Sequence, residues 1–189
     1  PTFSNSRFVE MTTIVDPTWT RVWYFDGAAY IDNTTEANSE GGTAFTIAAG
    51  NTTILYLTNG ATAGTDNKVG GAWFDLATLG VGGTVVWEYW NGAWVALAGV
   101  TDDTGNYTID QEDIRWTVPA DWATTTVNGV SGYWIRGRVS VAFTTPATAT
   151  FIGPMDELTL SDAGVPALAF ARLQDGSTAT IARAYSTNL

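Results

Sequence analysis

The segment that constrains the fold most is Val85–Leu97, with the sequence VVWEYWNGAWVAL. Its Asn91-Gly92 dipeptide lies between two stretches of alternating apolar residues, which is the strongest short-range signal for a β-hairpin. An isolated two-stranded hairpin is at best marginally stable in water, so other strands must cover its aromatic side chains. This segment therefore predicts a layered, all-β fold.

The alternation within this hairpin assigns its side chains to two faces. A two-residue turn pairs Tyr89 with Trp94. It also pairs Trp87 with Ala96 on the same face, while Glu88 lies on the other face. Aromatic cross-strand pairs contribute roughly 0.2–1 kcal/mol each relative to Ala–Ala. Because burial contributes more than pairing, we expect the face of the three aromatic residues to pack against a second sheet.

Short apolar segments bounded by turn residues occur throughout the central part of the chain, at the spacing that is typical of sandwiches and barrels. No segment longer than a turn keeps the helical period of 3.6 residues. We predict a jelly-roll-like antiparallel β-sandwich, with strands near 22–25, 29–32, 43–47, 52–58, 72–76, 114–118, 133–141 and 147–152. The segment Pro119–Trp122 is predicted to form a short turn that folds Trp122 onto the sandwich, and Asn128-Gly129 is predicted to form a tight turn.

Composition divides the chain into three parts. Residues 1–22 form a predicted N-terminal arm, residues 23–155 form the sandwich, and residues 156–189 form a C-terminal hairpin or arm that turns at Asp175-Gly176. Each arm lies either on its own domain or against a neighbouring subunit as an added strand. The apolar arm residues that we expect at such an interface are Phe3, Phe8, Val9, Ile14, Phe170, Leu173, Ile181 and Tyr185.

The charge and residue content excludes several function classes. The chain has 189 residues, of which 14% are charged, and eight basic against nineteen acidic side chains give a net charge of −11. This balance disfavours nucleic acid and anionic membranes as partners. The chain contains neither cysteine nor histidine, which excludes disulfides, thiolate catalysis, Cys/His zinc sites and a histidine general base. We therefore expect no cofactor, and no apolar run approaches the length of a membrane span.

The acidic stretch 102–113 resembles a calcium-binding loop only in part. Asp102, Thr104 and Asn106 are spaced as in an EF-hand, but Tyr107 occupies the position of the glycine and Asp113 replaces the terminal glutamate. The flanking helices are also missing from the predicted strands. These departures favour a solvated hairpin loop over a cation site.

Glu88 is the carboxylate with the most unusual sequence context, because aromatic residues flank it. Either its pKa is raised for general acid chemistry, or it pairs with Arg136 or Arg138, which lie on one face of the predicted strand 133–141. Glycoside hydrolysis needs two carboxylates across a cleft, and no second one is singled out by its position. We favour ion pairing and expect no enzymatic activity.

Nine tryptophans in a β-protein also suggest stacking on sugars. Most of them alternate with apolar residues along strands, as core residues do. The exceptions are Trp19, Trp90 and Trp134, which we identify as candidates for glycan contact.

Several stretches resemble a module that recurs in structural proteins of tailed bacteriophages. The matching residues are LYLTNG (55–60), AWFDLATLGVGGTVVWEYWNGAWVAL (72–97), DDTGNYT (102–108) and VPADWATTTVNGVSGYWIRGRV (118–139). Segments of this kind are found in baseplate and tail-associated proteins and in other virion components. The match covers somewhat over half of the chain and keeps the order of the pieces.

The resemblance implies a non-enzymatic virion protein, assembled in the host cytoplasm. Within that class we favour a capsid decoration (cement) protein, because the chain is short, acidic and free of cysteine and has two arms. Its expected partners are the major capsid protein and copies of itself in a homo-oligomer. A component of the baseplate, tail or head–tail connector, and a carbohydrate-binding domain for receptor recognition, remain the alternatives.

Overall fold

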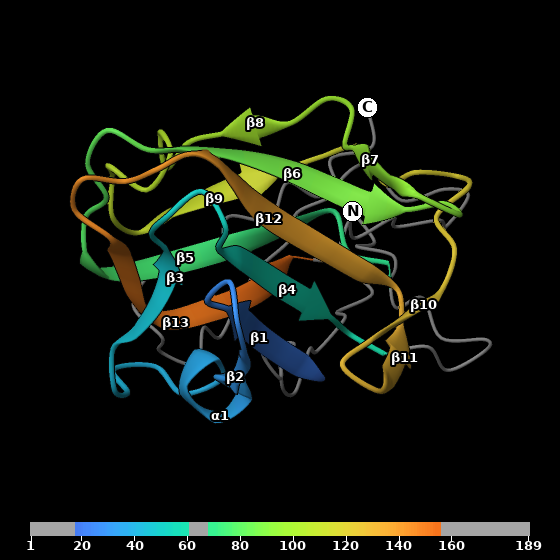
Figure 1. Ribbon diagram of the computed structural model, residues 1–189, viewed down its shortest axis with the longest axis horizontal. Helices are drawn as coiled ribbons and strands as arrows, with labels where there is room; N and C mark the ends of the chain where they lie inside the picture. The colour runs from blue at the N-terminus through green and yellow to red at the C-terminus, as the bar shows by residue number, and fades with distance from the viewer. Residues whose placement is uncertain (1–17, 61–67, 156–189) are drawn as a thin grey trace, which may run out of the picture. The chain divides into compact units, whose positions relative to one another are not determined.

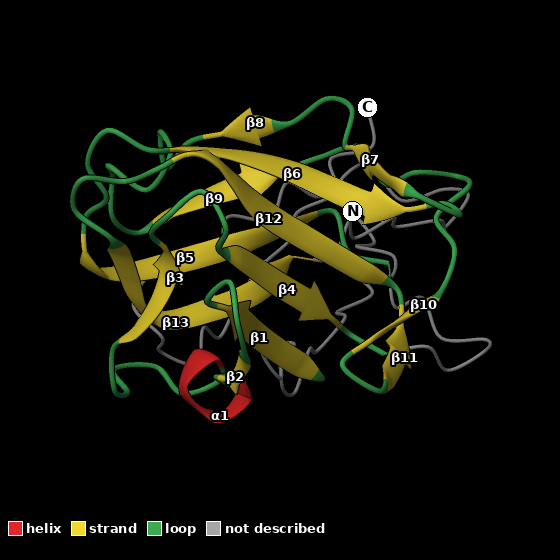
Figure 2. Cartoon of the chain, in the orientation of Figure 1, coloured by secondary structure: helices red, strands yellow, loops and turns green. Residues whose placement is uncertain are grey.

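The computed structural model describes residues 18–60 and 68–155. Within these residues the protein is all-β, with two antiparallel sheets, a small hairpin and one helical turn (Figure 2). The first sheet has the order β2 (Tyr30–Asp32), β1 (Arg21–Phe25), β4 (Ile54–Thr58), β12 (Trp134–Val141), β6 (Thr84–Trp90), β7 (Trp94–Ala96). The second has the order β3 (Phe45–Ala48), β13 (Ala147–Met155), β5 (Gly71–Thr78), β9 (Glu112–Arg115), β8 (Thr101–Asp102). The remaining elements are α1 (Thr34–Ala37) and the hairpin of β10 (Thr125–Val127) and β11 (Val130–Gly132).

The connections between strands give a jelly roll. From β3 to β6 the chain changes sheet at every step, then β6 and β7 form a hairpin within one sheet. After this hairpin the long strands alternate again: β7 lies in the first sheet, β9 in the second, β12 in the first and β13 in the second. The two sets β4-β12-β6-β7 and β3-β13-β5-β9 are thus the two four-stranded sheets of an eight-stranded jelly roll. Figure 1 shows β6, β12, β4 and β1 in front of β5 and β13. The predicted jelly-roll-like antiparallel sandwich is confirmed.

The core lies between the two sheets and is filled from both of them. Ile135 of β12 enters it from the first sheet, and Phe74 of β5 and Ile152 of β13 enter it from the second. Trp87 stacks on Trp116 with ring centroids 5.8 Å apart. Truncating side chains buried to this degree to alanine costs roughly 2–5 kcal/mol each. The core therefore holds the two sheets, and the loops that join them, in fixed positions.

The predicted pairing of the central hairpin is wrong by one residue. Three residues, not two, join β6 to β7, and Trp90 rather than Tyr89 faces Trp94. A type I′ turn needs a positive φ at both central residues, whereas Gly92 (φ 113°) has one and Asn91 does not. Because a shift of one residue exchanges the two faces of a strand, Trp94 lies on the outer face of the sheet and not in the core.

The alternation along β6 itself agrees with the prediction. Trp87 is buried in the core, and Glu88 lies on the opposite, outer face. By the same one-residue shift, Glu88 and not Trp87 faces Ala96. The sequence pattern thus predicts the faces of the longer strand correctly, while the register depends on the loop.

The folded domain begins earlier than the predicted boundary at residue 23. Trp19 and Val22 are buried in the core, and β1 begins at Arg21. The backbone N–H of Trp19 donates to Asn38 Oδ1 at 2.9 Å, and Asn38 Nδ2 donates to the Trp19 carbonyl at 2.8 Å. Residues 19–22 therefore belong to the sandwich, while the rest of the predicted N-terminal arm up to residue 17 and the predicted C-terminal part 156–189 lie outside the described residues.

Both predicted turns in the later part of the chain are confirmed. Asn128 (φ 45°) and Gly129 (φ 81°) join β10 to β11 with two positive φ values, as a type I′ turn requires. The turn at Pro119–Trp122 buries the Trp122 side chain against the core. Its indole Nε1 donates to the Trp134 carbonyl at 3.2 Å, which fixes this turn to the first sheet.

Candidate functional site

The arm residues predicted to make intersubunit contacts lie outside the described residues. They are Phe3, Phe8, Val9, Ile14, Phe170, Leu173, Ile181 and Tyr185. The described part of the chain nevertheless carries three surface features that bear on function. They are the outer face of the first sheet, the turn that contacts the tip of the central hairpin, and the loops at the other end of the sandwich.

Two of the three tryptophans predicted to contact glycans are buried, so the prediction is wrong for them. Trp19 packs into the core. Trp134 lies on the outer face of the first sheet, where it stacks on Trp23 at 5.3 Å and its Nε1 donates to the Val130 carbonyl at 3.1 Å. The reason is that the β10–β11 hairpin packs over this part of the sheet, through Val127 and Val130. Neither indole face is open to a sugar.

Trp90, the third candidate, is half-buried and pairs with Trp94. Their rings meet edge to face with centroids 5.5 Å apart. The Arg136 guanidinium lies over the Trp94 ring at 4.2 Å, within the range of a cation–π interaction, and Tyr56 touches the same ring from its edge. The outer face thus carries a partly exposed aromatic pair at the open edge of the first sheet.

Glu88 forms the predicted ion pairs. Arg136 lies directly opposite it on β12, and Arg136 Nε donates to Glu88 Oε2 at 2.7 Å. Arg138 Nη2 donates to Oε1 at 3.1 Å. The Glu88 carboxylate accepts from two guanidinium groups, so this arrangement favours a role in positioning Arg136 against the Trp94 ring over acid catalysis.

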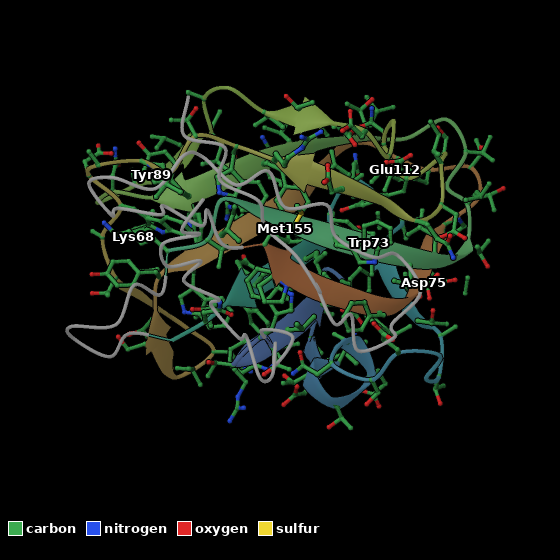
Figure 3. The ribbon with its side chains drawn as sticks, turned by 180° about the vertical axis from the view of Figure 1, so that it is seen from behind. Lys68, Trp73, Asp75, Tyr89, Glu112 and Met155 are labelled. Atoms are coloured by element: carbon green, nitrogen blue, oxygen red, sulfur yellow. The ribbon has the colours of Figure 1, made fainter. Side chains whose placement is uncertain are left out.

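The turn at Pro119–Trp122 makes hydrogen bonds both to the tip of the central hairpin and to the start of β12. The Asp121 carboxylate accepts from Tyr89 Oη and from Asn91 Nδ2, both at 3.0 Å. The hydrogen bonds from Asn91 and from Tyr89 lower the pKa of Asp121. Desolvation raises the pKa of the Tyr89 phenol, and its interaction with the Asp121 carboxylate raises that pKa further. Figure 3 shows Tyr89 and Lys68 at this same end of the sandwich.

The acidic stretch 102–113 forms a β8–β9 hairpin loop, as predicted, but it is not simply solvated. Gly105, Asn106 and Tyr107 have consecutive positive φ values of 58°, 58° and 63°, and the Tyr107 side chain is fully buried. Asp102 holds this turn by accepting from Thr104 Oγ1 at 2.5 Å and from the Asn106 N–H at 2.8 Å. Among the described residues, no three His, Cys, Asp or Glu side chains are placed to hold a metal ion.

The loops at the opposite end of the sandwich expose apolar side chains. We call this surface the loop end and define it by Leu79 (44% exposed), Val81 (52%), Ile109 (51%) and Val141 (52%). Figure 1 shows the β5–β6, β8–β9 and β12–β13 loops together at this end. Hydrogen bonds join them: the Gly80 N–H donates to the Tyr107 carbonyl at 2.8 Å, and the Thr144 N–H donates to the Val81 carbonyl at 2.8 Å.

Sequence reasoning missed both Trp94 and the loop end. Trp94 was assigned to the core because the hairpin was given a two-residue turn. The loop-end residues are far apart along the chain, and each is a single apolar residue near turn residues. A signal for them exists in the Gly-rich segment 80–83, but only the jelly-roll connections bring the three loops together.

Among the described residues, no helix is long and apolar enough to cross a membrane. Comparison of the sequence with models of known protein families and with curated proteins finds no match.

Proposed function

We propose that the chain is a non-enzymatic structural protein of a tailed-bacteriophage virion and, within that class, a capsid decoration protein. The observation that carries the proposal is that the segments resembling the phage module contact one another in the folded domain. They supply most of β5 and β12, all of β6 and β7, and the turn at Pro119–Trp122, so they contribute strands to both sheets of the jelly roll. The resemblance thus rests on one folded unit and not on scattered composition.

The contacts within this unit are specific. Asp121 of the turn binds the hairpin through Tyr89 and Asn91. Trp122 then binds the next strand through the Trp134 carbonyl, and the Ala123 N–H donates to the carbonyl of Trp90 at 2.8 Å. The central hairpin, the turn at Pro119–Trp122 and β12, which all lie within the stretches 72–97 and 118–139 apart from the end of β12, therefore contact one another. A sequence pattern that encodes such an interlocked unit supports a shared fold and, with it, the virion class.

Within the class of virion proteins, the low charge content and the exposed apolar side chains of the domain surface favour a decoration protein. Only 14% of residues are charged, and the loops at one end of the sandwich and the end of β12 expose four apolar side chains. Exposed apolar patches of this kind mark surfaces that pack against other proteins. Decoration proteins bind a repeating lattice through many modest contacts, which multivalency strengthens. The proposed partners are the major capsid protein and further copies of this chain, with the arms 1–17 and 156–189 adding contacts, on a virion assembled in the host cytoplasm.

Deletion of residues 1–15 tests the role of the N-terminal arm. The full chain and the truncated chain are mixed with particles of the phage that lack the protein, and bound protein is measured by co-sedimentation. We expect the truncated chain to keep its circular dichroism spectrum and to lose attachment. If the truncated chain attaches as well as the full chain, the N-terminal arm is not needed for attachment. If the full chain does not attach to the particles, the chain is not a decoration protein. Labelling of tails or baseplates in electron micrographs would instead support the alternative location.

The Trp90–Trp94 pair favours carbohydrate binding as a second candidate function. It is partly exposed and lies beside Asn91, whose amide binds Asp121 at the hairpin tip. Titration with oligosaccharides of the host cell surface, followed by tryptophan fluorescence, tests this candidate. If the pair binds the oligosaccharide, the fluorescence of the full chain changes saturably and Trp90→Ala abolishes the change. A fluorescence change that persists in Trp90→Ala shows that the Trp90–Trp94 pair is not the binding site.

A further inference from the structure

We infer that the loop end is the docking face of the domain, and that it binds a protein surface with an apolar centre and a rim of lysine or arginine side chains. The inference rests on the proposed function, since it assigns that surface to the major capsid protein. Three properties of the loop end support it: exposed apolar side chains, a backbone held by contacts within the domain, and a net negative charge.

The exposed apolar side chains come from the β5–β6 loop, the β8–β9 loop and the last residue of β12, at one end of the sandwich (Figure 1). The four residues of the loop end are more exposed than large apolar side chains usually are in a folded domain. The isolated bridge between Val81 and Thr145 ties the β5–β6 loop to the β12–β13 loop, and the β8–β9 loop joins them through the bond between Gly80 and Tyr107. These bonds hold the three loops beside one another, so one partner surface has their exposed apolar side chains within reach.

Contacts within the domain hold the backbone of the loop end. Gly80 and Gly83 lie directly against the Phe143 ring, where an added Cβ would come within 2.6 Å and 2.1 Å of ring atoms. Tyr107 is buried beneath the same loops, with its ring centroid 6.3 Å from that of Phe143. Because these contacts hold the loops in place, binding has little ordering entropy to overcome.

The charge beside the patch is negative. Residues 101–115 contain five acidic side chains, Asp102, Asp103, Asp110, Glu112 and Asp113, against the single base Arg115. Asp110 follows Ile109 directly and is exposed, and its carboxylate accepts only backbone N–H groups, those of Leu76 and Gln111, among the hydrogen bonds of the described residues. Figure 3 shows Asp75 and Glu112 on the half of the molecule that carries the loop end.

The negative charge beside the loop end distinguishes between the surfaces that could bind there. A basic rim on the partner complements it and speeds association, whereas a second copy of the chain would bring its own acidic loop to the contact. An anionic lipid surface or a nucleic acid would be repelled in the same way. A basic protein surface is therefore the occupant that the observed charges favour.

The test compares two double variants of the full chain that add the same charge. Val81→Asp with Ile109→Asp changes the loop end, and Ile31→Asp with Val100→Asp changes two exposed apolar residues elsewhere on the domain. Binding to capsids of the phage that lack the protein is measured by co-sedimentation at low and high salt, and folding is checked by near-UV circular dichroism. We expect the loop-end variant to lose at least about tenfold in affinity and the control variant to bind like the wild type.

Charge complementarity is tested separately. Asp110→Asn keeps an oxygen to accept from the Leu76 N–H, so we expect a folded protein whose affinity is lower at low salt and falls less steeply as salt rises. If the wild type binds capsids and the loop-end variant binds them equally well, the inference is wrong while decoration stands. If the wild type does not bind capsids, both are wrong. A loop-end variant that changes self-association in sedimentation velocity, but not capsid binding, assigns the patch to a second copy and overturns the inference.

Discussion

Replacing Glu88 by leucine tests whether a half-buried charge network holds the outer face of the first sheet. Glu88 is 8% exposed, and it accepts from Arg136 Nε at 2.7 Å and from Arg138 Nη2 at 3.1 Å. Without the carboxylate, the Arg136 guanidinium keeps its place against Trp94 but loses its counter-ion. The two arginines then repel each other across alternate positions of β12.

The expected loss in the free energy of unfolding depends on how exposed the Arg136 and Arg138 side chains are. The Arg138 side chain is 38% exposed, so its pairing contributes about 0–1 kcal/mol after solvent screening. The Arg136 side chain is 15% exposed, and removal of one partner from a buried pair costs roughly 3–5 kcal/mol. Because some water reaches both arginines, we expect Glu88→Leu to lower the free energy of unfolding by about 2–4 kcal/mol.

Urea unfolding followed by tryptophan fluorescence measures this change. Arg115→Ala serves as the comparison, because Arg115 also pairs with two carboxylates but its side chain is 53% exposed, and we expect a cost of about 1 kcal/mol or less. Glu88→Leu combined with Arg136→Leu should cost less than the sum of the single variants, since each removes the other's unpaired charge. A Glu88→Leu cost no larger than that of Arg115→Ala refutes the reasoning.

Three further predictions concern packing and pH. Gly83→Ala should destabilise the domain by about 1–3 kcal/mol or prevent folding, because the new Cβ overlaps the Phe143 ring. Gly50→Ala is the control: nothing lies within 4 Å of its added Cβ, so its stability should change by less than about 0.5 kcal/mol. Thermal unfolding of the two variants and the wild type measures both changes. Trp122→Phe should cost about 1–3 kcal/mol in urea unfolding, from the lost indole hydrogen bond and the space left behind, and a smaller loss contradicts its anchoring role. The folded-state pKa of Asp121 lies below its ordinary value of 3.8, so its contribution to stability is present above that value and is lost as pH falls through the folded pKa. Acid unfolding should therefore show the wild type more stable than Asp121→Asn at neutral pH, with the difference vanishing in strong acid; a constant difference contradicts the assignment.

Much of the fold followed from local patterns because strand faces depend on neighbouring residues only. The alternation of Trp87 and Glu88 predicted which side chain enters the core, and the alternation along 133–141 predicted that Arg136 and Arg138 share one face as alternative partners of that carboxylate. The strand register then places Arg136 directly opposite it. The Asn128-Gly129 turn was likewise predicted from residues that tolerate positive φ.

The errors arose where tertiary contacts decide the outcome. The sequence pattern puts Trp134 on the strand face opposite the core and predicts that this face is open, but the β10–β11 hairpin covers it. Trp19 lies in a polar stretch, and its burial depends on the distant Asn38. The loop end depends on the order of strands in both sheets, which local sequence patterns do not determine. A candidate surface built from several loops therefore requires the structure.

Electron cryomicroscopy of intact particles of the phage that we propose encodes this chain tests the central claim most directly. We predict ordered copies of the jelly roll at symmetry-related positions on the capsid, with the β5–β6 and β8–β9 loops turned toward the lattice. Density for the jelly roll on the tail or baseplate, or on the capsid with those loops turned toward solvent, would contradict the account.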